Sequence, residues 1–437
     1  MGLTITILIL IFTIVIGVPV VFAFGASLIY MVVAMGYQSG ALLSSGYSKL
    51  NTIVLLAIPL FILAGGIMER GNIGDALVGF INIFVGRIRG GLGAVAIIAS
   101  ALFGAISGSA AATLSCIGSI MFPKLREAGY SKGHAASVIV NASPLGLLIP
   151  PSSIQIIYAW SANQSVLTCF LATVGPGLLL AFLLCCVNWY ICRTSPEMHE
   201  AYVNRQLEGS SKTSNWSKTK RAIPALLMPV IILGGIYGGI MTPTEAAAVS
   251  VLYAIPVGFL VYKGLTFKSF KDALVETGTT TGVLMVMFLI VMILSRLFVM
   301  ENLPNKVIGL FMSVSEDPRA ILIMVNLFMI MIGMLMDDVS GTLLCTPLLL
   351  PLMVKIGVSP IQFAAILGVN LGMGNITPPT APLLYLGGRL GKASIREMLR
   401  PTMLMIIFAW MPTLIITTYV PAVSLALPSW FLGRALF

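Results

Sequence analysis

The chain has few charged side chains: Asp, Glu, Lys and Arg make up 9% of its 437 residues. A soluble domain carries about 25% charged residues, so this composition cannot cover a protein with a water-facing surface. The shortage of charge therefore excludes most soluble enzymes.

Side chains that hold metals are also scarce. The chain has two histidines, His134 and His199, which are remote from each other in sequence. Its six cysteines lie in or beside apolar runs, without metal-ligand spacing or an extracellular disulfide framework, and we interpret them as small apolar residues. These cysteines are Cys116, Cys169, Cys185, Cys186, Cys192 and Cys345. We expect neither a transition metal nor an organic cofactor.

The sequence contains no Ser/His/Asp motif and no Walker-type phosphate loop. ATP-driven transport within this chain is therefore not expected. An ion gradient is the natural source of energy for any transport that the chain performs.

Apolar residues are abundant, at 58% of the chain, and the mean hydropathy is +1.02. A length of 437 residues leaves room for about ten to fourteen membrane segments of roughly 20 residues each. Backbone groups in hydrocarbon must be satisfied within their own segment, so these segments are predicted to be helices. The sequence thus predicts an all-α polytopic membrane protein. Spanning or near-spanning apolar runs cover 3–35, 52–68, 91–106, 166–192, 222–241, 246–263, 281–300, 320–336 and 402–427.

The first apolar run lacks a positively charged n-region and a cleavage pattern, so we expect it to be retained rather than removed as a signal peptide. The formal net charge is +10, but the basic residues lie in short loops between apolar runs, as the positive-inside rule requires. Nucleic-acid binding is therefore not expected. The polar linker 193–221 is the best candidate for a cytoplasmic segment.

Two regions, 107–160 and 337–390, are apolar but interrupted by Gly, Pro, Ser, Thr and Asn. A shift of 228 positions superposes them without a gap and indicates an internal repeat. The matched residues mostly control the backbone: Pro123 with Pro351, Gly129 with Gly357, Ser131 with Ser359, Gly146 with Gly374, and Pro150-Pro151 with Pro378-Pro379. Before each region lies a short amphipathic stretch, MERGNIGDALVGFINIFVGRIRGG or MENLPNKVIGLFMSVSEDPRA. Each is predicted to lie at the membrane interface as an arm, the alternative being an ordinary loop helix.

Paired Gly/Pro-interrupted hydrophobic segments in two halves of a chain point to the binding site of a secondary transporter. Broken helices expose N–H groups that suit anions and carbonyls that suit Na⁺. In the first half, a re-entrant hairpin that turns near Ser107 to Ala110 and packs on a helix broken at Pro150-Pro151 would gather carbonyls and hydroxyls into a sodium cage. The alternative for SGSAAAT is close helix packing by small residues.

In the second half, Asp337 and Asp338 follow an apolar run directly, where carboxylates are costly and therefore candidate functional groups. They equally suit the N-cap at a hairpin tip. Glu245, in TPTEAAAV, is interpreted mainly as part of a helix cap. Arg296, near the end of an apolar run, is expected to pair or to extend toward water.

The motifs FGAISGSAAAT, LIPPSS, GGIYGGIMTPTEAAAV and GNITPPTAP together resemble the large membrane subunit of tripartite ATP-independent periplasmic (TRAP) transporters, along essentially the whole chain. The resemblance implies an inverted-repeat, elevator-type transporter with two re-entrant helical hairpins and broken helices in the bacterial inner membrane. It also implies Na⁺ coupling, a periplasmic substrate-binding protein and a small four-helix membrane subunit, here expected as a separate polypeptide. The implied substrate is an organic anion such as a C4-dicarboxylate or sialic acid.

Carried over by motif, two sets of candidate site residues follow. The candidate sodium-binding residues are Ser107, Gly108, Ser109, Asn141, Pro150, Gly341, Thr342, Gly374, Thr377 and Pro378. The candidate substrate-binding residues are Ser152, Ser153, Asp337, Ser340, Asn375 and Thr380. We expect Thr377→Ala, or a bulky residue at Gly374 or Gly341, to weaken sodium dependence before it affects folding.

The chain is divided into scaffold and transport segments on the same basis. The predicted division is 1–90, scaffold helices and first arm; 91–165, first transport repeat; 166–280, scaffold helices with the polar linker; 281–319, scaffold helix and second arm; 320–395, second transport repeat; and 396–437, C-terminal helix.

Three other functions are weighed against this one. A stand-alone sodium/carboxylate symporter would share the paired breaks but need no partner. A channel also uses re-entrant loops, but two broken segments rather than one filter argue against it. An intramembrane enzyme would use Asp337 and Asp338, yet adjacent helical positions point about 100° apart and do not readily form a carboxylate pair.

Overall fold

The computed structural model describes residues 2–86, 88, 90–194 and 215–433. Eight helices within these ranges are long and apolar enough to cross a bilayer. A ninth span arises if Lys132–Leu148 and Ser153–Ser161, which meet at a 41° bend, are taken together. The all-α polytopic fold predicted from the composition is confirmed. Most of the polar linker, 195–214, lies outside the described residues.

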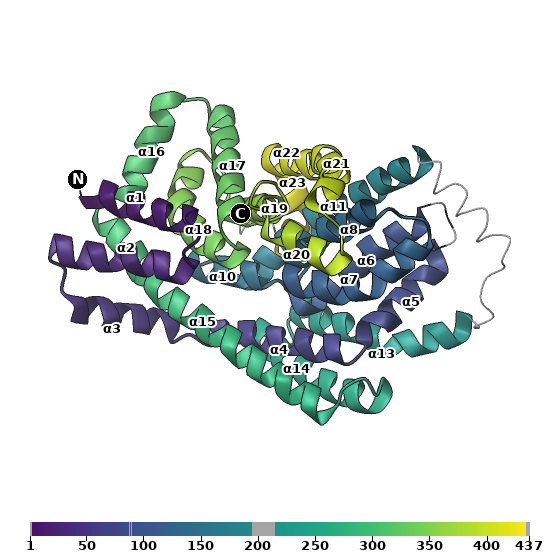
Figure 1. Cartoon of the computed structure of the whole chain (residues 1–437). Coiled ribbons are helices and arrows are strands. Elements are labelled where there is room, and N and C mark those ends of the chain that lie inside the picture. Colours follow the sequence, from purple (N-terminus) through teal and green to yellow (C-terminus); the bar gives the residue numbers. More distant parts are fainter. Residues whose placement is uncertain (1, 87, 89, 195–214, 434–437) are drawn as a thin grey trace.

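The N-terminal apolar run over 3–35 is two helices rather than one. Gly17 takes a left-handed φ of 91°, and Pro19 directly precedes the second helix, so the chain turns between them. The two helices pack on each other as a hairpin (Figure 1). The helices here are α1 (Gly2–Val15), α2 (Val20–Met35), α3 (Ser39–Leu50) and η1 (Ile53–Leu56).

A second group of helices flanks the repeats. In Figure 1, α15 extends along one side of the molecule, beside α4, which in turn packs on α14. The helix α15 is continuous across residue 280, so the predicted boundary there falls inside an element. The group consists of α4 (Ala57–Arg70), α5 (Ile73–Val85), α13 (Asn215–Tyr237), α14 (Pro243–Pro256), η2 (Val257–Val261), α15 (Phe267–Met300) and α16 (Leu303–Val314).

Each predicted arm is a short helix entered through a left-handed asparagine. Asn72 precedes α5 with φ 57°, and Asn302 precedes α16 with φ 59°. Asparagine tolerates this conformation better than most residues, which allows a sharp turn after α4 and after α15. The helices have 13 and 12 residues, too short to cross a bilayer.

The two repeats share one order of helices, except that a single helix of the second repeat matches two helices of the first, which are divided at residues 143–144. The hairpin helices α6 and α7 end at Ser107 and Glu127, and their counterparts α17 and α18 end 228 positions later, at Leu335 and Lys355. The first repeat consists of α6 (Gly91–Ser107), α7 (Ala110–Glu127), α8 (Lys132–Ala142), α9 (Leu145–Leu148) and α10 (Ser153–Ser161). The second consists of α17 (Pro318–Leu335), α18 (Asp338–Lys355), α19 (Pro360–Gly374) and α20 (Pro382–Gly391).

The repeats interlock at their broken helices. The helix that follows the break in the first repeat, α10, packs on α18 and α19 of the second repeat. The helix that follows the break in the second repeat, α20, packs on α7 and α8 of the first repeat. Tyr158 Oη donates to the Pro360 carbonyl at 2.5 Å, and Gln155 Nε2 donates to the Ala364 carbonyl at 3.2 Å. Each half of the core is therefore completed by the other.

Helices outside the repeats extend this core. The long helix α11, which the sequence division groups with the scaffold, packs on α6 and α19, and α21 packs along α8. The elements are α11 (Val166–Thr194), α21 (Ile395–Met405), η3 (Ile406–Trp410), α22 (Met411–Tyr419) and α23 (Pro421–Leu432).

Candidate functional site

The first hairpin turns through two residues, Gly108 and Ser109, between α6 and α7. Gly108 has a left-handed φ of 60°, and Ser109 is extended and caps α7 by accepting from the Ala112 N–H at 3.4 Å. A Cβ on Gly108 would lie 3.1 Å from the Pro151 carbonyl oxygen. Both the backbone conformation and the close approach therefore favour glycine at this tip.

The tip is attached to the first helix break by one carbonyl. The Gly108 carbonyl accepts from Ser153 Oγ at 2.7 Å and from the Ser153 N–H at 3.3 Å. Ser153 begins α10, directly after the Pro150–Pro151 break. The structure thus brings Ser107, Gly108 and Ser109, predicted for sodium, beside Ser153, predicted for substrate, where the hairpin meets the break.

Thr113 joins this group and was not among the predicted site residues. Its Oγ1 donates to the Ser109 carbonyl at 2.8 Å and lies 3.3 Å from Ser107 Oγ. The backbones of Gly104 and Gly146 meet beside it, because a Cβ on Gly146 would lie 3.0 Å from Gly104 Cα and 3.1 Å from Thr113 Oγ1. The cluster contains uncharged hydroxyl and carbonyl oxygens, the type of group that transporters offer to Na⁺.

The second hairpin has a carboxylate where the first has a hydroxyl. Asp337 caps α18, its Oδ2 accepting from the N–H groups of Val339 and Ser340 at 3.2 and 3.4 Å. The Ser340 hydroxyl donates to Asp337 Oδ1. Of the two roles that the sequence allowed for Asp337, the N-cap is the one seen.

The second break is attached to its hairpin in a similar way. Thr380 Oγ1 donates to the Met334 carbonyl. The side-chain amide of Asn375 is assigned so that its nitrogen faces carbonyl oxygens. That nitrogen donates to the Gly333 carbonyl at 3.1 Å and to the Met336 carbonyl at 3.2 Å. A Cβ on Gly374 would lie 2.6 Å from Gly333 Cα, so the second repeat reproduces the close glycine approach of the first.

Several predicted residues lie apart from these contacts. Asn141 Nδ2 donates to the Ser137 carbonyl within α8, and its buried Oδ1 has no partner; the buried hydroxyl of Ser152 also has none. Thr342 and Thr377 each donate to a carbonyl four residues earlier, those of Asp338 and Met373.

The remaining predicted positions carry no side-chain hydrogen-bonding group. Gly341 faces the Leu371 side chain. Pro150 and Pro378 form the breaks themselves, and Pro150–Pro151 and Pro378–Pro379 both have cis peptide bonds.

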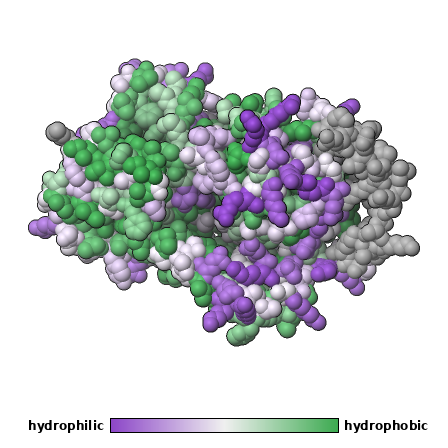
Figure 2. Space-filling model, viewed as in Figure 1, coloured by the Kyte–Doolittle hydropathy of each residue, from purple (hydrophilic) through white to green (hydrophobic). Residues whose placement is uncertain are grey.

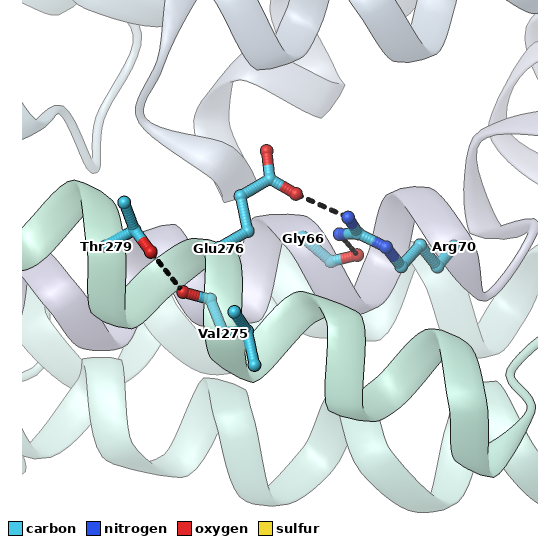
Figure 3. Close-up of polar contacts among 5 residues, drawn as sticks. All are labelled: Gly66, Arg70, Val275, Glu276 and Thr279. Carbon is cyan, nitrogen blue, oxygen red and sulfur yellow. Dashed lines mark hydrogen bonds and ion pairs between the residues drawn. The ribbon is translucent and has the colours of Figure 1, made fainter.

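Each hairpin touches a flanking helix near its tip: the first hairpin touches α4, and the second touches α15. A Cβ on Gly65 of α4 would lie 2.9 Å from Ser107 Cβ, and Ser340 Oγ lies 3.1 Å from the Met287 sulfur of α15. An ion pair between Arg70 and Glu276 joins α4 to α15, and Arg70 also donates to the Gly66 carbonyl (Figure 3). The two helices therefore form a joined support behind both tips.

A small pocket of about 10 Å³ lies where α18 of the second hairpin packs on α15 and α16, beside α2. Its lining is almost entirely apolar and includes Phe24, Val291, Leu294, Phe298, Pro304 and Leu343. Few directional interactions hold α18 against this support. Across the described ranges, no group of three or more His, Cys, Asp or Glu side chains is placed to hold a metal ion.

The fold and the paired sites define a multi-pass helical membrane transporter with two re-entrant hairpins and two broken helices. Residues 6–423 match the family model described as the tripartite ATP-independent periplasmic transporter, DctM component. The chain belongs to this family, as the sequence motifs indicated.

Named relatives agree with this assignment. The chain is 37% identical over 383 residues to the C4-dicarboxylate TRAP transporter large permease protein DctM of Pseudomonas aeruginosa, covering 86% of each. It is 33% identical to the sialic acid TRAP transporter large permease protein SiaM of Vibrio cholerae, covering 88% of each. It is also 33% identical over 424 residues to the isethionate TRAP transporter permease protein DctMQ of Oleidesulfovibrio alaskensis, but spans only 64% of that protein's length.

Solved structures support the fold alone. The YdaH transporter of Alcanivorax borkumensis superposes with a TM-score of 0.58 at 14% identity, covering 87% of this chain and 88% of that one. MtrF of Neisseria gonorrhoeae gives 0.57 at 14% identity, covering 86% and 84%.

Proposed function

We propose that this chain is the large subunit of a sodium-coupled secondary transporter that imports an organic anion across the bacterial inner membrane by an elevator motion. The observation that carries the proposal is the pairing of each hairpin tip with a helix break through a hydroxyl-to-carbonyl hydrogen bond: Ser153 to Gly108 and Thr380 to Met334. In the first repeat, this pairing gathers oxygen atoms without a formal charge.

Sodium is the coupling ion that suits these tips. Na⁺ takes hard oxygen ligands, and unwound backbone at membrane depth supplies them. The first site offers the hydroxyls of Ser107 and Thr113 and the carbonyls of Gly108 and Ser109. The second offers carbonyls at Gly333, Met334 and Met336. Binding there would hold a tip against its break.

An organic anion suits the helix N-termini that the same turns create. Helices α7, α10, α18 and α20 all begin at a tip or just after a break, where backbone N–H groups and the helix dipole favour negative charge. The named relatives carry C4-dicarboxylate, sialic acid and isethionate in their names. We therefore assign a carboxylate or a similar organic acid to this chain.

The elevator motion is supported by the contrast between the two kinds of packing. The repeats are tied together by hydrogen bonds, one of them fully buried, whereas α18 packs on α15 and α16 mainly through apolar side chains. An interlocked core can move as one body past such a support. Sodium drives the motion only to the extent that it binds the two end states with different affinity.

Two partners follow from the family. A tripartite transporter combines this component with others, and we assign the roles to a periplasmic substrate-binding protein and a small four-helix membrane subunit. The relative DctMQ, of which this chain spans 64%, leaves room in its own polypeptide for a second component.

Reconstitution tests the whole proposal. Proteoliposomes would contain this chain with or without its small subunit and binding protein, and uptake of labelled succinate and sialic acid would be measured under an inward sodium or potassium gradient. Uptake that needs all three components and sodium is the expected result. Sodium-driven uptake by the chain alone would instead establish a stand-alone symporter, and equal uptake under potassium would overturn sodium coupling.

A further inference from the structure

Four helix ends from different parts of the chain meet at one surface: the C-termini of α7 and α20 and the N-termini of α8 and α21. A Cβ on Gly391, at the end of α20, would lie 3.1 Å from Ala136 Cβ of α8 and 3.2 Å from Phe122 Cε1 of α7. A Cβ on Gly133 of α8 would lie 2.1 Å from the Glu397 carbonyl oxygen of α21. These close approaches fix the four ends as one patch.

Buried hydrogen bonds hold α8 against α21 below this patch. Ser137 Oγ donates to the Met398 carbonyl at 3.0 Å, and Thr402 Oγ1 donates to Ser137 Oγ at 3.0 Å. The two helix starts therefore keep a constant relative position, and so do the side chains that they carry.

The patch carries an excess of positive charge. We name the basic cluster by its six exposed members: Arg126, Lys132, Arg389, Lys392, Arg396 and Arg400. Neither of the two ion pairs found in the described ranges includes any of them. The acidic residues at these four helix ends are Glu127 and Glu397. Glu397 accepts from the N–H and hydroxyl of Ser394, both at 2.8 Å, and its charge also attracts Lys132 and Arg126, so two carboxylates stand against six cations.

The basic cluster lies at the level where membrane segments begin. Arg396 and Arg400 are in the first two turns of the candidate span Ile395–Tyr419, and Lys132 opens the bent span Lys132–Leu148 with Ser153–Ser161. Basic residues at the ends of spans reach the headgroup region of a bilayer. Figure 2 shows hydrophilic side chains over α20 and α21.

Apolar side chains are exposed between the charges. Leu390 is 39% exposed beside Arg389, and Leu399 is 42% exposed beside Arg400. A site for a small soluble anion gains nothing from leucines at its rim. A phospholipid uses both features, because its phosphate contacts cations while its acyl chains cover apolar surface.

We propose that the basic cluster binds the phosphate-bearing headgroup of an anionic phospholipid, with acyl chain against Leu390 and Leu399. The site joins α7 and α8 of the first repeat to α20 of the second. Bound lipid therefore stabilises the interlocked core. This inference rests on the membrane location of the chain and not on sodium coupling or substrate identity.

A binding experiment on the purified full chain in neutral detergent tests the proposal. Labelled short-chain phosphatidylglycerol is titrated, with phosphatidylcholine and inorganic phosphate as separate competitors. The test variant is Arg396→Gln/Arg400→Gln. The matched control, Lys306→Gln/Lys355→Gln, removes two exposed positive charges from outside the cluster.

Each basic residue near an anionic lipid surface contributes a roughly fivefold gain in affinity, so the test variant should bind about twenty-fold more weakly. The control should bind like the wild type, and neither competitor should displace the label. Equal binding by the test variant, an equal loss in the control, or displacement by inorganic phosphate would each overturn the proposal. Should Arg396→Gln/Arg400→Gln fail to fold, Arg389→Gln/Lys392→Gln provides the same test and the same outcomes.

Discussion

Ser109 and Asp337 occupy equivalent positions in the two repeats and do the same structural work. Each is the N-cap of the second helix of its hairpin, Ser109 through a hydroxyl that accepts from Ala112 and Asp337 through a carboxylate that accepts from Val339 and Ser340. The first cap is neutral and the second is charged. The two sites thus share their backbone architecture but differ in electrostatics.

The capping role of Asp337 predicts that its shape matters more than its charge. Asparagine is as good an N-cap as aspartate, whereas loss of a cap costs about 1 kcal/mol. We expect Asp337→Asn to keep sodium-driven uptake near the wild-type rate and Asp337→Ala to lower both uptake and thermal stability. Measuring both variants in proteoliposomes and by thermal unfolding checks this. If Asp337→Asn is inactive while Asp337→Ala folds normally, the carboxylate itself binds a ligand.

Thr113 is predicted to contribute to the first sodium site. Thr113→Val keeps the size of the side chain but removes the hydroxyl near Ser107 Oγ and the Ser109 carbonyl. Losing one such contact is worth about 1 kcal/mol, so half-maximal uptake should need about fivefold more sodium. Thr113→Ser retains the hydroxyl and should behave like the wild type. An unchanged sodium dependence in Thr113→Val would remove this residue from the site.

The bond between Ser153 and the Gly108 carbonyl is predicted to keep the first tip closed. In Ser153→Ala, the amides of the tip should exchange with solvent about fivefold faster, because a hydrogen bond worth about 1 kcal/mol is lost. Hydrogen exchange across residues 107–112 measures this directly. Ser119→Ala is the matched control, since this exposed hydroxyl on α7 bonds only to the Cys116 carbonyl. Equal exchange in both variants would show that the bond does not hold the tip.

The repeat could be predicted from the sequence because backbone-controlling residues mark it. Glycines and prolines at a constant spacing set the ends of α7 and α18 and the two breaks, and these local constraints survive in the fold. A glycine and a proline, Gly17 and Pro19, also mark the turn that divides the first apolar run into two helices. The sequence alone predicts a single segment there because its hydropathy stays high across the turn.

Contacts between the repeats could not be predicted in this way. Tyr158 finds the Pro360 carbonyl, and Gln155 the Ala364 carbonyl, only because α10 crosses into the second repeat. Such pairs depend on tertiary packing and leave no spacing in the sequence. The position of Thr113 could be predicted in part from the sequence. It lies four residues after Ser109 within AISGSAAAT, so helical geometry places its hydroxyl beside the tip.

The structure changes the expectation for a larger residue at Gly374. A Cβ there would lie 2.6 Å from Gly333 Cα and 2.8 Å from the Ile330 carbonyl oxygen, and neither backbone atom can move aside cheaply. Overpacking of this kind costs about 1–3 kcal/mol or more, so Gly374→Ala should lower the thermal stability instead of acting on sodium alone. At Gly341, the nearest atom is Leu371 Cδ2 at 2.8 Å, the end of a side chain that can rotate. Gly341→Ala should therefore fold and remain open to a sodium assay.

Thermal unfolding in detergent of the two variants, beside Gly278→Ala, separates these cases. A Cβ on Gly278 would have no atom within 4 Å beyond the adjacent residues and backbone of its own helix, so its alanine variant reports only the effect of an added methyl group on helix α15. The expected order of stability is Gly278→Ala highest and Gly374→Ala lowest, with Gly341→Ala between them. A Gly374→Ala protein as stable as the wild type would mean that the contact between α17 and α19 is looser than the close approach of Gly333 and Gly374 indicates.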